Sequence, residues 1–193
     1  MDAREYVEWF HNKFKISYSY NYFPTMKMDH AVLITMIEAF NIKTVCEIGT
    51  WKGDTALLLW LHPNIQRVKC IDVHKDMELN GTPYSHNAHV LMDKSEYGSM
   101  FKNTPIELVF ADTMTYPRGC EQHDLVFIDG NHDYEHIVND TELAKSWCPK
   151  VIVWHDYGGG NDDVVKFLNK IKTEKFMQFP GSLCVAVRAE ELK

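Results

Sequence analysis

The organisation of this chain follows from one stretch, Thr44–Leu59, which reads TVCEIGTWKGDTALLL. The apolar run 45–48 is followed by a loop containing Gly49 and Gly53, and the loop leads into an apolar run with helical composition. This order predicts a strand, a glycine-hinged loop and a helix. Such a loop lets the backbone approach a ligand closely, because glycine lacks a Cβ, and the helix start presents unpaired N–H groups.

The spacing of this loop narrows the class of ligand. It reads Glu47-x-Gly49-x-x-x-Gly53, so a glutamate stands where the dinucleotide fingerprint G-x-G-x-x-G has its first glycine. A second apolar run, 67–71, ends at Asp72, and a carboxylate at the end of the second strand is how a doubly wound fold holds ribose hydroxyls. Glu47 would repel a pyrophosphate but suits a cationic, amino-acid-bearing ligand. The alternative is a plain strand–turn–helix in another α/β protein.

Composition limits the partners and the compartment. The chain has 193 residues, 45% hydrophobic and 24% charged, which fits one globular domain over 1–193. The net charge of −7 and the lack of a lysine or arginine run argue against nucleic acid as the main partner. The sequence shows no signal-peptide core and no apolar run of about 20 residues. We therefore expect a cytoplasmic protein without a membrane span, and small molecules, sugars or a protein side chain remain open as its substrate.

The cysteines support the same compartment. They are odd in number, dispersed, and free of any C-x-x-C pair: Cys46, Cys70, Cys120, Cys148 and Cys184. Three of them fall in predicted core strands, so we expect buried, reduced thiols rather than disulfides.

The first forty residues lie outside the predicted cofactor-binding core, 41–193. Apolar spacing predicts a helix over 2–14, an aromatic loop over 17–25, and a helix over 31–40 that Asp29 would cap. This N-terminal segment could cover the substrate side of the core, pack as a helix onto the sheet, or form the contact surface between subunits of a homo-oligomer.

The remaining chain alternates strands and helices, which predicts an α/β, Rossmann-like, doubly wound sheet with helices on both faces. The expected strands are 43–48, 67–72, 106–110, 124–128, 151–154, 176–179 and 183–187. The expected helices of the core are 54–62, 84–101, 134–147 and one that begins near 162. The last two strands are joined by Pro180-Gly181-Ser182, a hairpin-like ending after five βα units.

Polar side chains follow three of the predicted strands. Asp112 comes after the third strand, Asp129 after the fourth, and His155 with Asp156 after the fifth. Carboxyl ends of parallel strands converge on one crevice. Asp112 could accept a hydrogen bond from an adenine amino group or serve only as a turn carboxylate. Carboxylates with waters suit Mg²⁺, whereas an imidazole in the set favours Mn²⁺, Fe²⁺ or Zn²⁺.

Two longer motifs, FIDGNHDYEHIVNDTELA (127–144) and VIVWHDYGGG (151–160), carry a family resemblance together with the glycine loop and Asp72. The chain resembles class I S-adenosylmethionine-dependent methyltransferases over about residues 30–190. Within them it is similar to the small-molecule subgroup of macrocin and other sugar O-methyltransferases, and more distantly to catechol O-methyltransferase. The resemblance implies a seven-stranded, mostly parallel sheet with an antiparallel last strand. It also implies methylation of a sugar, catechol-like or natural-product hydroxyl, assisted by a divalent metal in the metal-dependent members.

The resemblance also assigns roles at the site. Asp129 matches the first metal ligand of metal-dependent members, and His155 and Asp156 fall on the other two, although many members have an oxygen ligand where His155 stands. Related enzymes often have an acid at the position of Asn131, which cannot take a proton, so His132 is the expected general base. A structural hydrogen bond at the helix entry is the other reading of His132. The expected cofactor-binding residues are Glu47, Gly49, Thr50, Trp51, Gly53, Asp72, Val73, Asp112, Thr113 and Asp129.

Other functions stay open at this stage. One is a metal-independent class I methyltransferase acting on nitrogen or on a protein. Another is a non-catalytic module that binds S-adenosylmethionine. A nicotinamide-dependent Rossmann enzyme fits worst, because the G-x-G-x-x-G fingerprint is missing.

Overall fold

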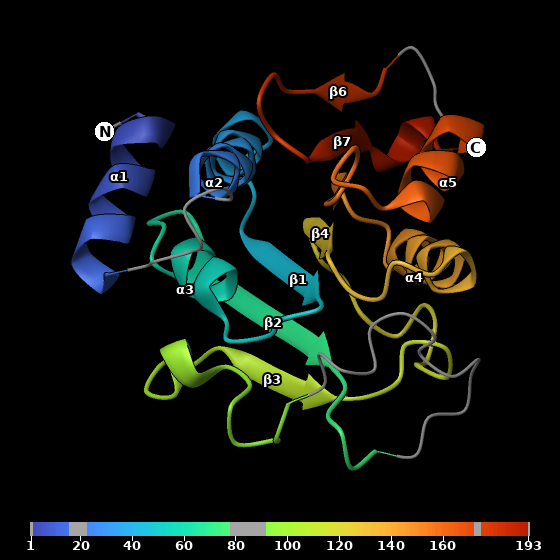
Figure 1. The fold of residues 1–193 in the computed structure, drawn as a ribbon, viewed down its shortest axis with the longest axis horizontal. Coiled ribbons are helices and arrows are strands. Elements are labelled where there is room, and N and C mark those ends of the chain that lie inside the picture. The colour runs from blue at the N-terminus through green and yellow to red at the C-terminus, as the bar shows by residue number, and fades with distance from the viewer. Residues whose placement is uncertain (1, 16–22, 78–91, 172–174, 193) are drawn as a thin grey trace.

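The computed structural model describes residues 2–15, 23–77, 92–171 and 175–192, and its centre is a seven-stranded sheet (Figure 1). The strand order is β3-β2-β1-β4-β5-β7-β6. The pairs among β1 to β5 are parallel, whereas β7 runs antiparallel to both β5 and β6. The strands are β1 Thr44–Ile48, β2 Arg67–Asp72, β3 Glu107–Phe110, β4 Leu125–Ile128, β5 Val151–Trp154, β6 Met177–Gln178 and β7 Val185–Arg188. The predicted fold class, with its antiparallel ending, is confirmed.

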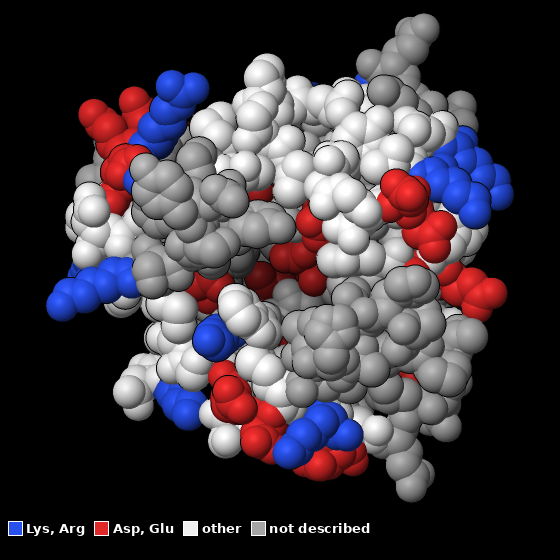
Figure 2. Space-filling model, viewed as in Figure 1, with Lys and Arg blue, Asp and Glu red and all other residues white. Residues whose placement is uncertain are grey.

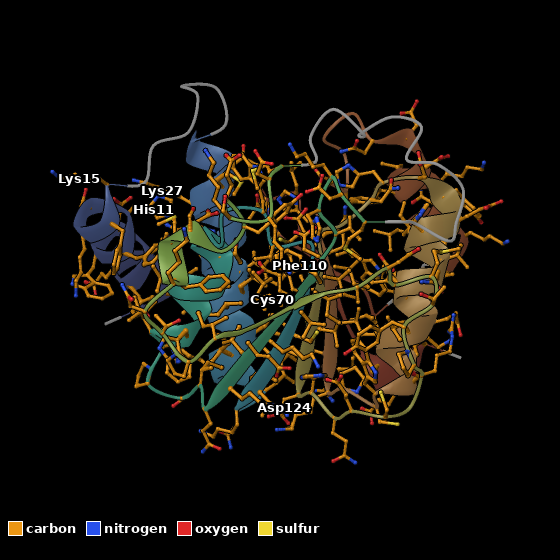
Figure 3. The ribbon with its side chains drawn as sticks, turned by 90° about the horizontal axis from the view of Figure 1, so that it is seen from below. His11, Lys15, Lys27, Cys70, Phe110 and Asp124 are labelled. Atoms are coloured by element: carbon orange, nitrogen blue, oxygen red, sulfur yellow. The ribbon has the colours of Figure 1, made fainter. Side chains whose placement is uncertain are left out.

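Helices cover both faces of the sheet. They are α1 Ala3–Phe14, α2 Phe23–Ala39, α3 Asp54–Trp60, α4 Tyr134–Ser146 and α5 Asp162–Ile171, with short 3₁₀ turns at Ser99–Phe101 and Ala189–Glu191. Figure 3 shows α1 to α3 on one side of the sheet and α4 with α5 on the other. Successive side chains of a strand point to opposite faces, so Val45 packs with the first layer and Cys46 with the second. Among the described residues, no helix has both the length and the apolar character needed to cross a membrane.

The strand order fixes where a ligand can bind. β1 lies between β2 and β4. From β1 to β3 the strands are added on one side of β1, and from β4 onward they are added on the other side. In an open α/β sheet, this switch point opens a crevice at the carboxyl ends of the strands. The loops that follow Ile48, Asp72 and Ile128 all start at this edge.

Two sequence predictions are wrong. Asp29 does not cap a helix, because α2 begins at Phe23 and Asp29 lies in its interior. Its carboxylate instead accepts hydrogen bonds from Ser182 and Leu183 near the C-terminus. Such a pairing over 153 and 154 residues leaves no signal in local sequence, whereas an aspartate before an apolar run imitates an N-cap.

The second wrong prediction is the helix over 84–101. Residues 84–91 lie outside the described part, and the described remainder consists of turns and the 3₁₀ turn Ser99–Phe101. Its backbone is held by the glycine loop, because Gly98 N donates to Trp51 O at 2.9 Å and Met100 N donates to Lys52 O at 3.1 Å. Gly98 has φ +60, which a helix interior does not accommodate.

Asp140, a buried carboxyl in α4, predicts a pH dependence of stability. Burial, followed by the charge of Asp112, raises the pKa of Asp140 from 3.8 to about 7, although hydrogen bonds from Thr113 and Asn139 oppose this. Between these two values the unfolded chain has lost a proton that the folded chain keeps. This group should therefore lower the free energy of unfolding by about 1.4 kcal/mol for each pH unit of increase.

Urea unfolding of wild type and Asp140→Asn at pH 5, 6 and 7 measures this effect. As the pH rises, the free energy of unfolding of Asp140→Asn should increase relative to that of wild type. Asp162→Asn, which changes an exposed carboxyl in the first turn of α5, should run parallel to wild type. A difference between Asp140→Asn and wild type that does not change with pH would contradict the assignment.

Candidate active site

The loop between β1 and α3 passes so close to β4 that only glycine fits at its start. Gly49 has φ +88, and a Cβ on it would lie 2.1 Å from the carbonyl oxygen of Asp129. Gly53 has φ +87, and a Cβ there would lie 2.3 Å from the Phe101 ring. Both glycines of the sequence motif are therefore required by contacts as well as by conformation. The loop and Asp129 form one edge of the crevice.

Asp72 holds the same loop from the side of β2. Its carboxylate accepts hydrogen bonds from the N–H groups of Thr50 at 2.7 Å, Trp51 at 2.9 Å and Val73 at 2.7 Å. These bonds fix Trp51 at φ +47, which is unusual for a bulky residue, and leave its indole 44% exposed. The predicted ribose carboxylate thus lies at the loop, and it also shapes the loop.

Two buried carboxyls, Glu47 and Asp54, interact electrostatically with Asp129. Burial first, and then the charge of Asp129, raises the pKa of Glu47 well above its usual value. Thr50 Oγ1 donates to Glu47 at 3.1 Å. Burial also raises the pKa of Asp54, the first residue of α3, to about 6, with Asp129 contributing again. A cation placed among these groups would favour their charged forms. Figure 2 shows acidic side chains in a hollow near the centre of the face in view.

Asp112 and Thr113 follow β3, and Thr113 is hydrogen-bonded to α4. Asp112 is 7% exposed, and its carboxylate accepts a hydrogen bond from Met114 N at 2.9 Å, as a turn carboxylate does. The Thr113 carbonyl accepts from Asn139 Nδ2 at 2.9 Å. The structure thus places the expected adenine-binding residues beside the crevice and gives Asp112 a local structural bond as well.

A second group of side chains follows β4 and β5. Nε2 of His132 lies 2.8 Å from Asp156 Oδ2, and Nδ1 of His155 lies 3.1 Å from the same oxygen. Nδ1 of His155 also lies 3.2 Å from Asp129 Oδ1. Ligand atoms of Asp129, His132 and Asp156 all lie within 4.8 Å of one another. The structure therefore brings together all four residues that the sequence singled out at these two strand ends.

The two imidazoles in this group face carboxylates through buried nitrogens. His132 Nε2 and His155 Nδ1 are both buried, and neither has a hydrogen-bond partner with good geometry among the described residues. Each nitrogen instead lies near carboxylate oxygens at ion-pair distance. Two carboxylates and two such imidazole nitrogens form a donor set that fits a divalent metal, with nitrogen ligands favouring Mn²⁺, Fe²⁺ or Zn²⁺.

Electrostatics couple these four side chains. Burial alone would lower the pKa of His155, but Asp129, Asp156 and Asp29 raise it well above its usual value. Burial raises the pKa of Asp156, whereas the neighbouring imidazoles of His132 and His155 lower it. The effect of the imidazoles is larger, so the pKa of this carboxyl is lowered. The group therefore favours separated charges, with anionic carboxylates facing cationic partners.

Sequence reasoning missed one contributor, Asp29 of α2. Its Oδ2 lies 3.0 Å from His155 Nε2, on the side of the ring away from Asp129 and Asp156. Asp29 is only 2% exposed, and burial of a charged side chain at this level requires partners. The one signal available in the sequence, a lone aspartate within an apolar helical run, does not identify the partner.

Comparison with known proteins adds a family. Residues 46–157 match the model of a methyltransferase domain family, which is more than half of the chain. An uncharacterized protein, R132 of Acanthamoeba polyphaga mimivirus, is 28% identical over 120 residues, which is 59% of this chain. The chain spans 51% of that relative, about half its length.

Solved structures share the fold. The O-methyltransferase TomG from Streptomyces achromogenes, in complex with S-adenosylmethionine, has a TM-score of 0.50 at 17% identity, covering 97% of this chain and 90% of its own. The N-methyltransferase NodS from Bradyrhizobium japonicum has a TM-score of 0.50 at 15% identity, covering 86% and 94%. At such identities the likeness concerns the fold, and the acceptor atom differs between the two.

The close approach at Gly49 gives a prediction. Gly49→Ala should reduce the free energy of unfolding by about 1–3 kcal/mol more than Gly160→Ala, because the added methyl group overlaps the Asp129 backbone. Gly160 is a matched control, with φ +87 and nothing within 4 Å of an added Cβ, so only the backbone strain is shared. Chemical unfolding measures both variants. Equal losses of unfolding free energy in the two variants would contradict this prediction, because they would show that the backbone near Asp129 moves aside without an energetic penalty.

Proposed function

We propose that this chain methylates a hydroxyl oxygen of a small acceptor with the help of a divalent metal. The premise is that the chain belongs to the methyltransferase domain family and is an S-adenosylmethionine-dependent methyltransferase. One observation carries the oxygen and metal part of this proposal. Buried imidazole nitrogens of His132 and His155 lie 2.8, 3.1 and 3.2 Å from carboxylate oxygens of Asp129 and Asp156 beside the cofactor crevice.

The cofactor half of the site is suited to a cationic ligand. When bound, S-adenosylmethionine supplies the methyl group from a positively charged sulfonium, and a metal lowers the pKa of a hydroxyl beside it. Glu47 and Asp54 have raised pKa values because they are buried near Asp129, so a cationic ligand would be stabilised there. The glycine loop would hold the ligand close to the backbone, and Asp72 would keep that loop in place. Trp51, Val73, Asp112 and Thr113 complete the proposed cofactor contacts.

Asp129, His155 and Asp156 are the proposed metal-holding residues. His155 has the features of a metal-ligating histidine, because its side chain is 10% exposed and its second ring nitrogen contacts a carboxylate. Asp129 and Asp156 supply anionic oxygens from two adjacent strands. This set would hold a hydroxylated acceptor at the edge of the cofactor crevice, where positioning of the reacting atoms provides much of the acceleration.

His132 is the proposed general base. Its side chain is 28% exposed against 10% for His155, so an acceptor could reach the part of the ring away from the buried Nε2. Burial lowers the pKa of His132, but Asp156, whose Oδ2 lies 2.8 Å from His132 Nε2, and Asp129 raise it above its usual value. The grouping of Asp129, His132 and Asp156 within 4.8 Å favours a second candidate role, in which His132 is itself a metal ligand.

Calorimetric titration tests the cofactor and the metal separately. We expect wild type to bind S-adenosylmethionine with micromolar affinity and to give a further heat with Mn²⁺ that Asp129→Ala loses, because that variant removes an anionic ligand. Asp162→Ala removes the same charge from an exposed position and should retain the Mn²⁺ heat. Cofactor heat without metal heat would favour a metal-independent enzyme acting on nitrogen or protein. Lack of cofactor binding would contradict the proposal.

A second measurement separates the two roles of His132. His132→Gln should reduce methyl transfer by about 100-fold or more, because glutamine cannot take the proton, while Mn²⁺ affinity stays close to wild type. Turnover is followed as S-adenosylhomocysteine formation with a panel of catechol and sugar acceptors. A large loss of Mn²⁺ affinity in this variant would place His132 in the ligand set. Unchanged turnover with a metal-dependent acceptor would exclude it as the base.

A further inference from the structure

We propose that Asp29 is a positioning residue that keeps a proton on Nε2 of His155, so that Nδ1 of the same ring is available to a metal. The metal part rests on the function proposed above. The location of the proton does not, because it follows from hydrogen bonding around Asp29. Asp29 and its partners in the C-terminal turn lie outside residues 46–157, the part that matches the family model.

The contacts of Asp29 determine which of its atoms face which partner. Oδ1 accepts hydrogen bonds from Ser182 Oγ at 2.6 Å and from the Leu183 backbone N–H at 2.7 Å. Oδ2 lies 3.0 Å from His155 Nε2. An ionised carboxylate has no proton to donate, so the short contact with the imidazole requires a hydrogen on Nε2.

That hydrogen decides the state of the other ring nitrogen. A neutral imidazole carries one proton, so a proton held at Nε2 leaves a lone pair on Nδ1. Nδ1 lies 3.2 Å from Asp129 and 3.1 Å from Asp156, which is where the proposed metal would be held. In an imidazolium, Nε2 keeps its proton as well, and a metal would replace only the proton on Nδ1. Asp29 thus fixes the orientation of His155 in both states, and it fixes the tautomer of the neutral ring.

Asp29 could alternatively be a metal ligand itself, because Asp29, His155 and Cys184 also form a close group. The described contacts argue against this second site. Oδ1 of Asp29 is already occupied by two donors, and burial raises the pKa of the Cys184 thiol, which disfavours the thiolate that metals require. A metal bound at Nδ1 of His155 requires neither the loss of a hydrogen bond at Asp29 nor a thiolate at Cys184.

Asp29→Asn gives a sharp test because the donors around residue 29 are fixed. The Leu183 N–H can only donate, so the amide oxygen of the substituted side chain must replace Oδ1, and its NH₂ group must face His155. In the neutral imidazole, Nε2 must then accept a hydrogen bond, which moves the ring proton to Nδ1, next to Asp129 and Asp156. The variant has the same shape and keeps both hydrogen bonds to the C-terminal turn, so we expect it to fold.

Two readouts follow this change. In metal-free, nitrogen-labelled protein, at a pH high enough for the His155 ring to be neutral, the NMR resonance of Nε2 should have the shift of a protonated ring nitrogen in wild type and of an unprotonated one in Asp29→Asn. In calorimetry, Mn²⁺ affinity should fall by about 10- to 100-fold in the variant. Ser182→Ala removes a different partner of Asp29 and leaves Oδ2 facing His155, so neither readout should change.

The outcomes separate this inference from the proposed function. A protonated Nε2 in Asp29→Asn, or wild-type Mn²⁺ affinity in that variant, would overturn the positioning role. The same losses in Ser182→Ala would also overturn it, because they would show a general effect of loosening the turn. If wild type binds no Mn²⁺, the metal-assisted proposal fails, while the Nε2 resonance in metal-free protein still decides the role of Asp29.

Discussion

The rest of the structure depends on the close approach of two backbones, at the end of β1 and the end of β4. Gly49 passes Asp129 so closely that a Cβ would lie 2.1 Å from its carbonyl oxygen. Because of this approach, the loop that would hold the cofactor and the aspartate that opens the second cluster share one edge of the crevice. A larger residue at position 49 would separate the two halves of the site. The switch in strand order around β1 is what makes this edge available.

Charge organises the site in two different ways. In the cofactor half, burial raises the pKa values of carboxyls, as at Glu47 and Asp54. In the half after β4 and β5, imidazoles lie among the carboxylates, and the pKa of Asp156 is lowered. The first half suits a ligand that brings its own positive charge, whereas the second already contains proton donors that a metal could replace. This contrast provides a physical reason to place the sulfonium cofactor in one half and the acceptor in the other.

The fold and the strand-end residues could be predicted from the sequence, because their signals are local. Apolar runs indicated the strands, and Gly49, Asp129 and His155 each directly follow one of them. The helix predicted over 84–101 failed in its described part, because Gly98 hydrogen-bonds to the distant glycine loop. Asp29 failed for the same reason, since its partners are more than a hundred residues away. Periodicity reports burial but does not identify the partner of a buried polar group.

The choice of histidine at position 155 explains why a distant carboxylate is needed at all. An oxygen ligand presents lone pairs whatever its surroundings, whereas an imidazole has two nitrogens and is a ligand only through the one without a proton. A histidine at a strand end therefore needs a fixed acceptor on its far side. In the described part of the doubly wound core, the carboxylates that contact His155, Asp129 and Asp156, both lie on the near side. α2 supplies the far-side acceptor through Asp29, and the turn before β7 fixes Asp29 in place. In the proposed site α2 thus takes part in the chemistry, through an aspartate as specific to it as the histidine that it contacts.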